Sequence, residues 1–333
     1  MANAGSGLSG SIGFGAETSY GVYAPATRWV PWEEEKFAVE RKFSQAKGIV
    51  GGSLVQQAQQ VVLLTQMVKG SLKFPVVNSG MGLLLKSIMG AATGPVQQGT
   101  TAAYASTFTI APTVGDSLSV QIGRPQTSGI ITPFNYLGCK ATSIEITLES
   151  GAVAECAMDF VGQQMTEADT LVTPVYGTPN PIVFSFQGST LSAGAIGSET
   201  AMGNVRKANI KIERKLDEER FYIGGNGLLD EPIEDDFLAI TGDLTVDFTD
   251  TTDWDAYVNA GEQISIILNL VGQQIATGYN FGLKLAVPVA QIEGSDPNMS
   301  GPKIVERQVK FEGLNDNVHQ PLTITYTSTD TTL

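Results

Sequence analysis

Two segments of this chain repeat each other without a gap. Residues 39–52 read VERKFSQAKGIVGG and residues 212–225 read IERKLDEERFYIGG, which places them at a constant offset of 173 positions. The shared residues are Glu40, Arg41, Lys42, Gly51 and Gly52 in the first segment and Glu213, Arg214, Lys215, Gly224 and Gly225 in the second, with Val39, Phe43 and Val50 matching Ile212, Leu216 and Ile223. Such a match limits the fold strongly, because it indicates one structural unit built twice.

The repeat continues through both halves in the same order. The matching segments are Lys69–Phe74 with Thr241–Val246, the helix-like stretches Leu83–Gly90 with Trp254–Gly261, Met158–Gln164 with Val309–Leu314, and the proline-led strands Pro181–Phe186 with Pro321–Tyr326. We therefore predict an N-terminal arm over residues 1–35 and a first domain over 36–188. A linker rich in glycine, serine and alanine follows over 189–204, and a second domain covers 205–333.

Alternation of apolar and polar residues predicts that strands dominate both domains. Ile144, Ile146 and Leu148 alternate with polar residues, and the same pattern covers 243–248. A period of two is typical of a strand with one buried and one exposed face. The helical signals are few and short, so the sequence predicts a duplicated all-β fold with one short α-helix beside each copy.

The net charge of −14 is concentrated in the second half of the chain. Residues 1–190 contain 10 Lys and Arg against 12 Asp and Glu, whereas residues 191–333 contain 10 against 22. The first half is thus at −2 and the second at −12. This balance argues against a protein that grips nucleic acid, which needs cationic side chains to displace the counterions of phosphate.

The residue types needed for most catalytic and metal sites are scarce. His319 is the one histidine, so a Ser-His-Asp or Cys-His arrangement would have to use it. Cys139 and Cys156 both fall on predicted strands without metal-ligand spacing, and we expect them to be free thiols. We expect no enzyme activity, no cofactor, no metal and no membrane span, since no apolar run reaches the ~20 residues that a bilayer requires.

Three aromatic residues stand out in the glycine-rich first 35 residues. Phe14, Trp29 and Trp32 are set among small residues that look like an extended arm. Such residues either anchor the arm on a neighbouring subunit or cap their own domain. We keep both interpretations and name the three as candidate inter-subunit contacts.

The chain also resembles a known family over nearly its whole length. The residues that carry the resemblance are Ile12–Gly21, Trp29–Pro31, Ile49–Gly52, Phe134–Lys140, Ser143–Ile146, Asp159–Val161, Phe311–Asp316 and Pro321–Thr325. This ordered set is similar to that of the major tail tube proteins of long-tailed, siphovirus-like bacteriophages. No single motif is diagnostic, so the resemblance rests on the order of the segments.

The resemblance implies a fold, a function and a set of partners. Each copy would be a tail-tube-type β-sandwich or barrel domain with a flanking helix. The protein would be a structural protein of the virion that assembles in the host cytoplasm into stacked rings. The rings would enclose the tape-measure protein during assembly and later conduct double-stranded DNA without binding it specifically. Tail terminator and tail-tip proteins would be further partners.

Five acidic residues are candidates for the wall of such a channel. Glu145, Glu155 and Asp159 alternate with apolar residues in the first copy, and Asp243 and Asp247 do so in the second. The resemblance implies that an acidic lumen lets DNA slide past, because like charges in a wet channel repel over roughly 8–10 Å. Which sheet face turns inward is left open by the sequence.

The duplication bears on the number of chains in a ring. Two tube-like domains per chain predict a ring of three chains with pseudo-sixfold symmetry. A ring of six chains is the alternative, because the copies have diverged and their loops differ in length. A different function class also remains, namely a tandem β-sandwich binding module such as an adhesin or a tail-tip component.

Overall fold

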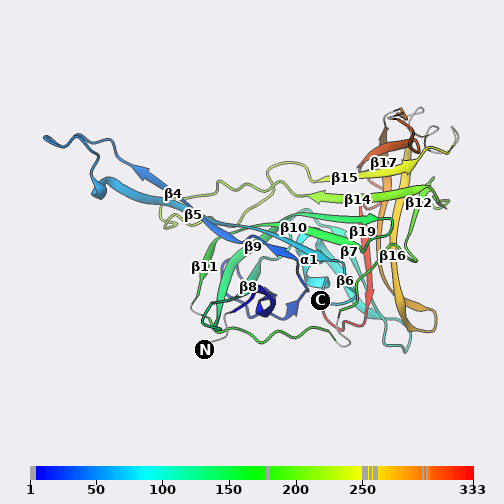
Figure 1. The fold of residues 1–333 in the computed structure, drawn as a ribbon, viewed down its shortest axis with the longest axis horizontal. Coiled ribbons are helices and arrows are strands. Elements are labelled where there is room, and N and C mark those ends of the chain that lie inside the picture. Colours follow the sequence, from blue (N-terminus) through cyan, green and yellow to red (C-terminus); the bar gives the residue numbers. More distant parts are fainter. Residues whose placement is uncertain are drawn as a thin grey trace.

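The structure of this chain, a computed structural model, describes residues 5–167, 169–177, 181–249, 254, 257, 262–294, 296–297, 299 and 301–333. Strands dominate these residues, and every strand pairing among them is antiparallel. The all-β prediction is therefore confirmed. Figure 1 shows the helix α1 (Gly82–Met89) among the strands, with a long hairpin of β4 (Ala38–Gln45) and β5 (Val61–Pro75) extending to one side.

Among the described residues, the first half of the chain contains the helix α1 (Gly82–Met89) and eleven strands. They are β1 (Ser11–Ala16), β2 (Arg28–Trp29), β3 (Glu34–Glu35), β4 (Ala38–Gln45), β5 (Val61–Pro75), β6 (Gly90–Gln97), β7 (Tyr104–Ile110), β8 (Leu118–Pro125), β9 (Ile131–Glu149), β10 (Glu155–Gly162) and β11 (Gln164–Thr166). Two 3-10 turns, at Gly7–Ser9 and Ala58–Gln60, precede β1 and β5.

The second half contributes eight strands among the described residues. They are β12 (Thr190–Gly194), β13 (Thr200–Ala201), β14 (Val205–Glu213), β15 (Ala239–Asp247), β16 (Gln263–Ala276), β17 (Tyr279–Gly294), β18 (Glu306–Gly313) and β19 (Thr323–Ser328). The second predicted helix falls almost entirely outside the described residues. Of that stretch the structure describes Trp254 and Tyr257, both helical, and the two rings meet edge to face at 6.3 Å.

The first strand pair of each half has the same register. Glu34 of β3 lies opposite Lys73 and Val39 of β4 opposite Val68. The same pairs recur in the second half, Lys207 opposite Thr245 and Ile212 opposite Ile240. The residues of β14 thus match those of β3 and β4 at the offset of 173 that the sequence repeat predicts.

The next pairing also repeats, and a glycine faces a phenylalanine in both copies. Gly70 of β5 lies opposite Phe160 of β10, and Gly242 of β15 lies opposite Phe311 of β18. A Cβ atom on Gly242 would lie 2.1 Å from the Phe311 ring, which explains why this strand position holds no side chain. The order β4, β5, β10, β9 is therefore matched by β14, β15, β18, β17.

The two halves are joined edge to edge in one sheet. Residues 143–149 of β9 pair with residues 207–213 of β14, so that the strands of the first half continue directly into those of the second. A second joint forms where β19 near the C-terminus pairs with β7. Residues 36–188 and 205–333 are thus two repeats in the sequence, and their strands pair with each other in the folded chain.

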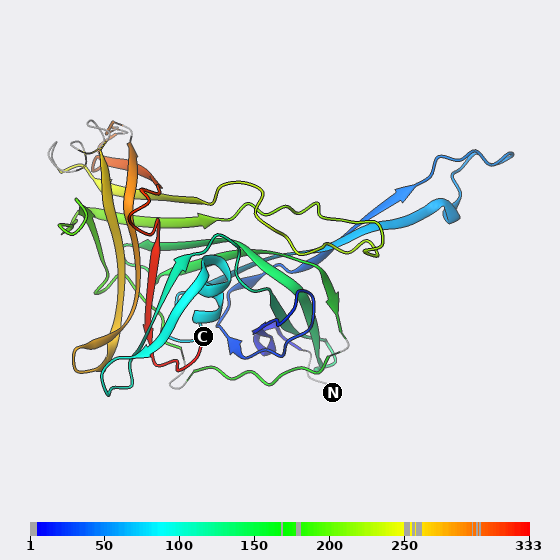
Figure 2. The same cartoon turned by 180° about the vertical axis from the view of Figure 1, so that it is seen from behind.

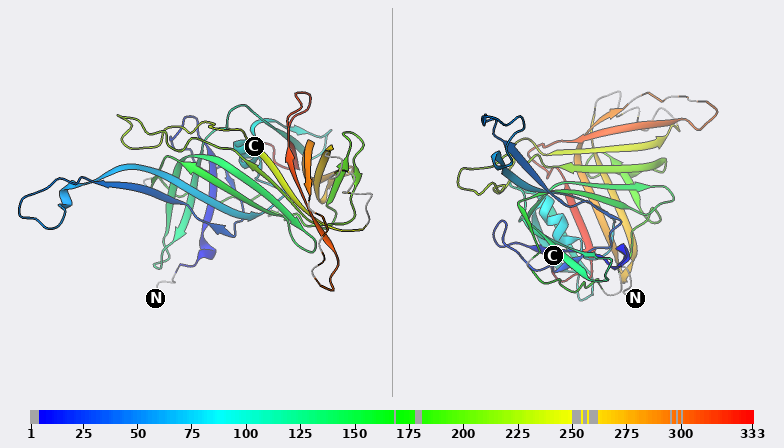
Figure 3. Two further views of the ribbon diagram at one scale, coloured as in Figure 1. Left: turned by 90° about the horizontal axis from the view of Figure 1, so that it is seen from above. Right: turned by 60° about the vertical axis from the view of Figure 1, so that its left-hand side comes forward.

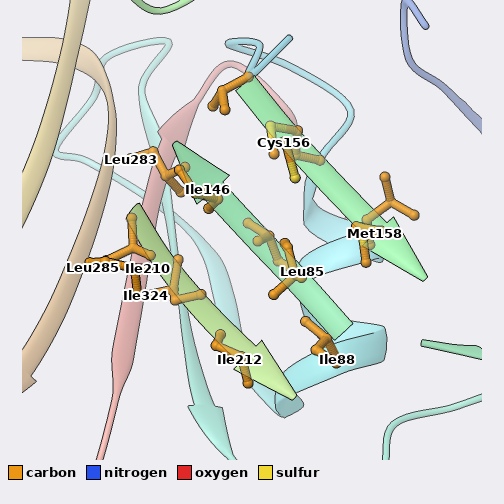
Figure 4. Close-up of a cluster of buried hydrophobic side chains, with 14 of the residues drawn as sticks. Leu85, Ile88, Ile146, Cys156, Met158, Ile210, Ile212, Leu283, Leu285 and Ile324 are labelled. Atoms are coloured by element: carbon orange, nitrogen blue, oxygen red, sulfur yellow. The ribbon is translucent and has the colours of Figure 1, made fainter. Parts of the chain in front are cut away.

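One hydrophobic core lies against the sheet and contains residues from both halves. Figure 4 shows Ile146, Ile210 and Ile212 on neighbouring strands, facing Leu85 and Ile88 of α1. The side chains of Leu283, Leu285 and Ile324 complete this cluster from β17 and β19. Because both halves bury apolar surface in the same core, neither is expected to fold independently of the other.

The glycine-rich N-terminal residues are part of this fold. Strand β1 pairs with β8 and β2, Phe14 has no exposed surface, and Trp29 is 7% exposed. Phe14 and Trp29 thus pack inside their own chain, in line with the second of the two interpretations, a cap on their own domain. Trp32 is half-buried against the same core.

Two other predicted segments differ from expectation. The linker over 189–204 contains β12 and β13, and β12 pairs with β16. Pro181–Phe186 makes only isolated bridges, through Val183 and Ser185, whereas the matching Pro321–Tyr326 leads into the regular strand β19. Small residues in 189–204 therefore serve close packing of a strand, since Ala193 is fully buried.

The hairpin of β4 and β5 extends far beyond the sheet, as Figures 2 and 3 show. We call residues 38–66 the arm, which is distinct from the N-terminal residues 1–35. Segment 214–238 directly follows β14 and is the repeat counterpart of most of the arm. It lies beside the base of the arm (Figure 2). The backbone N–H of Gln66 donates to the carbonyl of Gly227, and Lys69 pairs with Glu218 at 2.8 Å.

The repeated glycine–phenylalanine contact gives a stability prediction. Replacing Gly242→Ala should destabilise the fold by about 1–3 kcal/mol, because the new methyl group overlaps the Phe311 ring and the backbone is fixed on both sides. Denaturant unfolding followed by circular dichroism measures the change. The matched control is Gly203→Ala, where a Cβ meets no atom within 4 Å. Equal stability of the two variants would contradict the packing argument.

Candidate functional site

One face of the joined sheet is polar across both halves. In antiparallel strands, directly opposed residues point to the same side, so the register assigns each side chain to a face. Glu145 of β9 lies opposite Ala157 of β10 on one side and opposite Lys211 of β14 on the other. Asp243 of β15 lies between Asn209 and Lys310 in the same way. Their neighbours in sequence are the buried residues of the core.

We call this surface the polar face and define it by alternate residues of five strands. They are Ser143, Glu145, Thr147 and Glu149 of β9; Glu155, Ala157 and Asp159 of β10; Lys207, Asn209, Lys211 and Glu213 of β14; Asp243, Thr245 and Asp247 of β15; and Glu306, Gln308 and Lys310 of β18. The set contains eight carboxylates and three lysines, which leaves an excess of negative charge.

All five acidic residues singled out in the sequence lie on the polar face. Glu145, Glu155 and Asp159 come from the first half, and Asp243 and Asp247 from the second, and the β9–β14 pairing brings the two groups onto one surface. None of the five is buried. The period-two pattern was sufficient to find them, because it places every second residue of a strand on the same side.

Ion pairs neutralise part of this charge. Lys211 pairs with Glu213 at 2.9 Å, and Lys73 of β5 pairs with Glu155 at 2.8 Å. Arg206 pairs with Asp247. The hydrogen bond to Glu213 raises the pKa of Lys211 above its ordinary value, so this cation stays charged through the physiological range. The remaining carboxylates outnumber the cations, and the surface is negative at neutral pH.

Hydrogen bonds fix several of the acidic side chains. The Ser143 hydroxyl donates to Asp159 at 2.8 Å, and the Asn209 amide donates to Glu145 across the β9–β14 joint. The Asp243 side chain makes no hydrogen bond or ion pair with the described residues and is exposed to solvent. The polar face is therefore a broad, wet and partly ordered acidic surface rather than a pocket that would enclose a small ligand.

The rest of the described chain offers little for catalysis. His319 lies on an exposed loop, where its Nδ1 is 2.7 Å from Asp316, and no Ser or Cys joins this pair. No group of three or more His, Cys, Asp or Glu with metal-binding geometry occurs among the described residues. No helix there is long and apolar enough to cross a membrane.

A comparison with known protein families identifies the family of this chain. The sequence model of a family described as phage tail tube protein matches residues 7–313, which is nearly the whole chain. The chain belongs to the phage tail tube protein family. No curated protein matches it. The resemblance found in the sequence is thus confirmed at the level of the tail tube.

Membership gives the general role of the protein. A phage tail tube protein is a structural component of the virion tail that assembles with copies of itself and associates with other tail components. Its large surfaces are therefore expected to be contact or channel surfaces. For this tail tube protein the polar face is the candidate channel wall, and the arm is the most extended candidate contact.

Sequence reasoning missed one residue that organises the fold around the site. Arg214 follows β14 and is 2% exposed, and its guanidinium donates to the carbonyls of Ile88, Met89 and Ala111. It also pairs with Glu234 at 2.8 Å. The last carbonyls of a helix lack hydrogen-bond donors within the helix, and the Arg214 guanidinium donates to these carbonyls at the end of α1. The repeat marked this residue, as the counterpart of Arg41, without revealing its role.

Cys156, behind the polar face, and Cys139, farther along β9, should both be inert in the folded protein. Burial raises the pKa of Cys156 well above its ordinary value, the Glu145 carboxylate raises it further, and burial likewise raises the pKa of Cys139. Both thiols stay protonated at pH 8, and alkylation should be at least about a hundredfold slower than in denaturant, since it requires the fold to open. Mass spectrometry after iodoacetamide treatment measures the rate.

A cysteine on the exposed side of the same strand provides the control. The variant Ala157→Cys places a thiol on the polar face, one residue from Cys156, and should be alkylated in the folded protein at the rate of a free thiol. Rapid reaction of Cys156 itself in native buffer would contradict the assignment of the two faces.

Proposed function

We propose that this protein forms stacked rings that make up the hollow tail tube, with the polar face lining the bore. The observation that carries the proposal is the continuous sheet of two repeated units, whose single polar face holds eight carboxylates and three lysines. Family membership supports a role in a tube, and the sheet has a surface long and polar enough to serve as the inner wall of that tube.

An acidic wall suits the passage of double-stranded DNA. Phosphates are repelled by carboxylates within about one Debye length, ~8 Å at physiological ionic strength. Few cations are available to release counterions, so DNA gains little by adhering. In this proposal the tape-measure protein occupies the bore during assembly in the host cytoplasm, and the DNA passes through during ejection. Terminator and tail-tip proteins close the two ends.

The ring is proposed to contain three chains. Each chain supplies two units with the same strand order and register, residues 36–188 and 205–333, so three chains give six units around the axis. Native mass spectrometry of isolated rings tests this number. Rings should have three times the 35.2 kDa mass of one chain. A mass of six chains would contradict the trimeric ring but would remain consistent with the proposed tube.

Reversing charges on the polar face should change how tubes interact with DNA. The triple variant Glu145→Lys, Asp159→Lys and Asp243→Lys leaves the core residues untouched and gives the face six cations against five carboxylates. We expect it to assemble, and its tubes to retain double-stranded DNA in a way that weakens with added salt. Co-sedimentation of tubes with labelled DNA at 50 and 200 mM salt measures retention.

The control carries the same number of reversed charges outside the polar face. Glu167→Lys, Asp235→Lys and Glu262→Lys alter exposed carboxylates on other segments. Tubes of this variant should exclude DNA from the bore as the wild type does. Equal DNA retention by both triple variants would show that net charge matters and that the polar face is not the channel wall. A wild-type protein that stays monomeric would instead favour the binding-module alternative.

A further inference from the structure

We propose that the arm of one chain docks on the second half of a neighbouring copy, in the way that segment 214–238 docks on the first half of its own chain. This inference rests on the proposed ring assembly and names the contact between neighbours. In it, Arg41 and Phe43 take the places on the neighbour that Arg214 and Leu216 hold within the chain.

The contact inside the chain is well defined. Arg214 is 2% exposed and donates to three backbone carbonyls of the first half. Leu216 is 8% exposed and packs in a small apolar cluster with Val114, Val161 and Leu229. Segment 214–238 thus attaches to the first half through the buried cation Arg214 and, two positions on, the buried side chain of Leu216, with Leu229 of the same segment buried beside it.

The same two positions of the arm have no such contacts in a single chain. Arg41 and Phe43 are the repeat counterparts of Arg214 and Leu216, and both are exposed, with Phe43 at 60%. Other large apolar side chains extend the exposed patch along the arm, namely Ile49, Val50, Leu54, Val55, Val61, Val62, Leu63 and Leu64. Folded monomers rarely expose so many large apolar side chains along one hairpin, which indicates a contact with a protein partner.

The repeated register identifies that partner as a second copy. Because β3, β4 and β5 pair as β14 and β15 do, the two halves are related by a rotation, and in the proposed ring the same rotation carries the second half onto the first half of the next chain. The contact between segment 214–238 and the first half is then repeated between the next chain's arm and this chain's second half. The contact between chains therefore needs no type of surface that the single chain does not already use.

The receiving surface can be named from the same correspondence. Met67, Lys69, Lys140 and Val161 surround the contact in the first half, where Lys69 pairs with Glu218 and Lys140 with Glu231. Their counterparts by register are Ala239, Thr241, Gln291 and Glu312. None of these four is buried, and they form the receiving patch on the second half.

Charge supports the pairing of these two surfaces. The hairpin over residues 38–75 contains five cations and one carboxylate, Glu40. The second half, by contrast, contains 22 Asp and Glu against 10 Lys and Arg. In the receiving patch Glu312 stands where the first half has Val161, beside the place that Phe43 takes, so the patch offers the cations of the arm a carboxylate where the first half offers Leu216 an apolar side chain. Opposite charges across an interface select the correct partner and speed its encounter.

Photo-crosslinking locates the contact directly. Phe43 is replaced by p-benzoylphenylalanine, and the protein is mixed with isotopically labelled wild-type chains before assembly and irradiation. We expect crosslinks between chains that map by mass spectrometry to the strands of the receiving patch, β15, β17 or β18. Crosslinks that map only to residues 36–188 of the other chain would overturn the inference while leaving the ring intact.

Substitutions test whether the contact drives assembly. Arg41→Glu and Phe43→Ser should each raise the protein concentration needed for assembly by about tenfold or more, as removal of a central interface anchor does. Both residues are exposed in the single chain, so the melting temperature of the unassembled protein should not change. Analytical ultracentrifugation across a dilution series measures assembly.

Lys42→Ala is the matched control. Its counterpart Lys215 remains half-exposed, with a side chain 3.3 Å from Asp236, so loss of Lys42 should leave the assembly concentration within about twofold of wild type. Assembly of Arg41→Glu and Phe43→Ser at the wild-type concentration would overturn the inference. Failure of the wild-type protein to form rings would overturn the proposed function and, with it, this contact.

Discussion

The pairing of β9 with β14 is the interaction on which the remaining structure depends. It joins residues 143–149 to 207–213 and thereby makes one sheet from two repeated units. Because side chains alternate along a strand, a slip of one residue at this joint would move Ile210 and Ile212 from the core to solvent. The burial of these isoleucines against α1 therefore fixes the register, and the register fixes which residues form the polar face.

The duplicated sheet also explains why the arm and segment 214–238 differ. Segment 214–238 finds a surface on its own chain, and its arginine and leucine are buried there. The arm over residues 38–66 has the same start in sequence and no such surface within the chain. A repeat of two units always leaves one unmatched contact at each end, and closure into a ring is the arrangement that satisfies both ends.

Local sequence patterns predicted the strands, and the same period of two placed the five named carboxylates on one sheet face. The five named carboxylates needed no tertiary information. The conserved spacing of the Glu-Arg-Lys segments likewise predicted the matched registers. The pairing of β9 with β14 was beyond such reasoning, since nothing in either strand specifies a partner about 60 residues away.

Composition misled where small residues serve packing instead of flexibility. The N-terminal residues looked like an arm because of their glycines, yet a Cβ on Gly13 would lie 2.6 Å from the indole nitrogen of Trp29. Glycine there allows β1 to approach Trp29, which is why Phe14 and Trp29 are internal. Residues 189–204 were interpreted as a linker for the same reason, and Ala193 proved to be a core position of β12.

A cryo-electron microscopy reconstruction of assembled tubes, at a resolution that shows side chains, tests the central claim most directly. The account predicts threefold rings in which the strands β9, β10, β14, β15 and β18 of every chain line the bore, with Glu145 and Asp243 pointing toward the axis. A bore lined by any other surface, with the polar face turned outward, would contradict it.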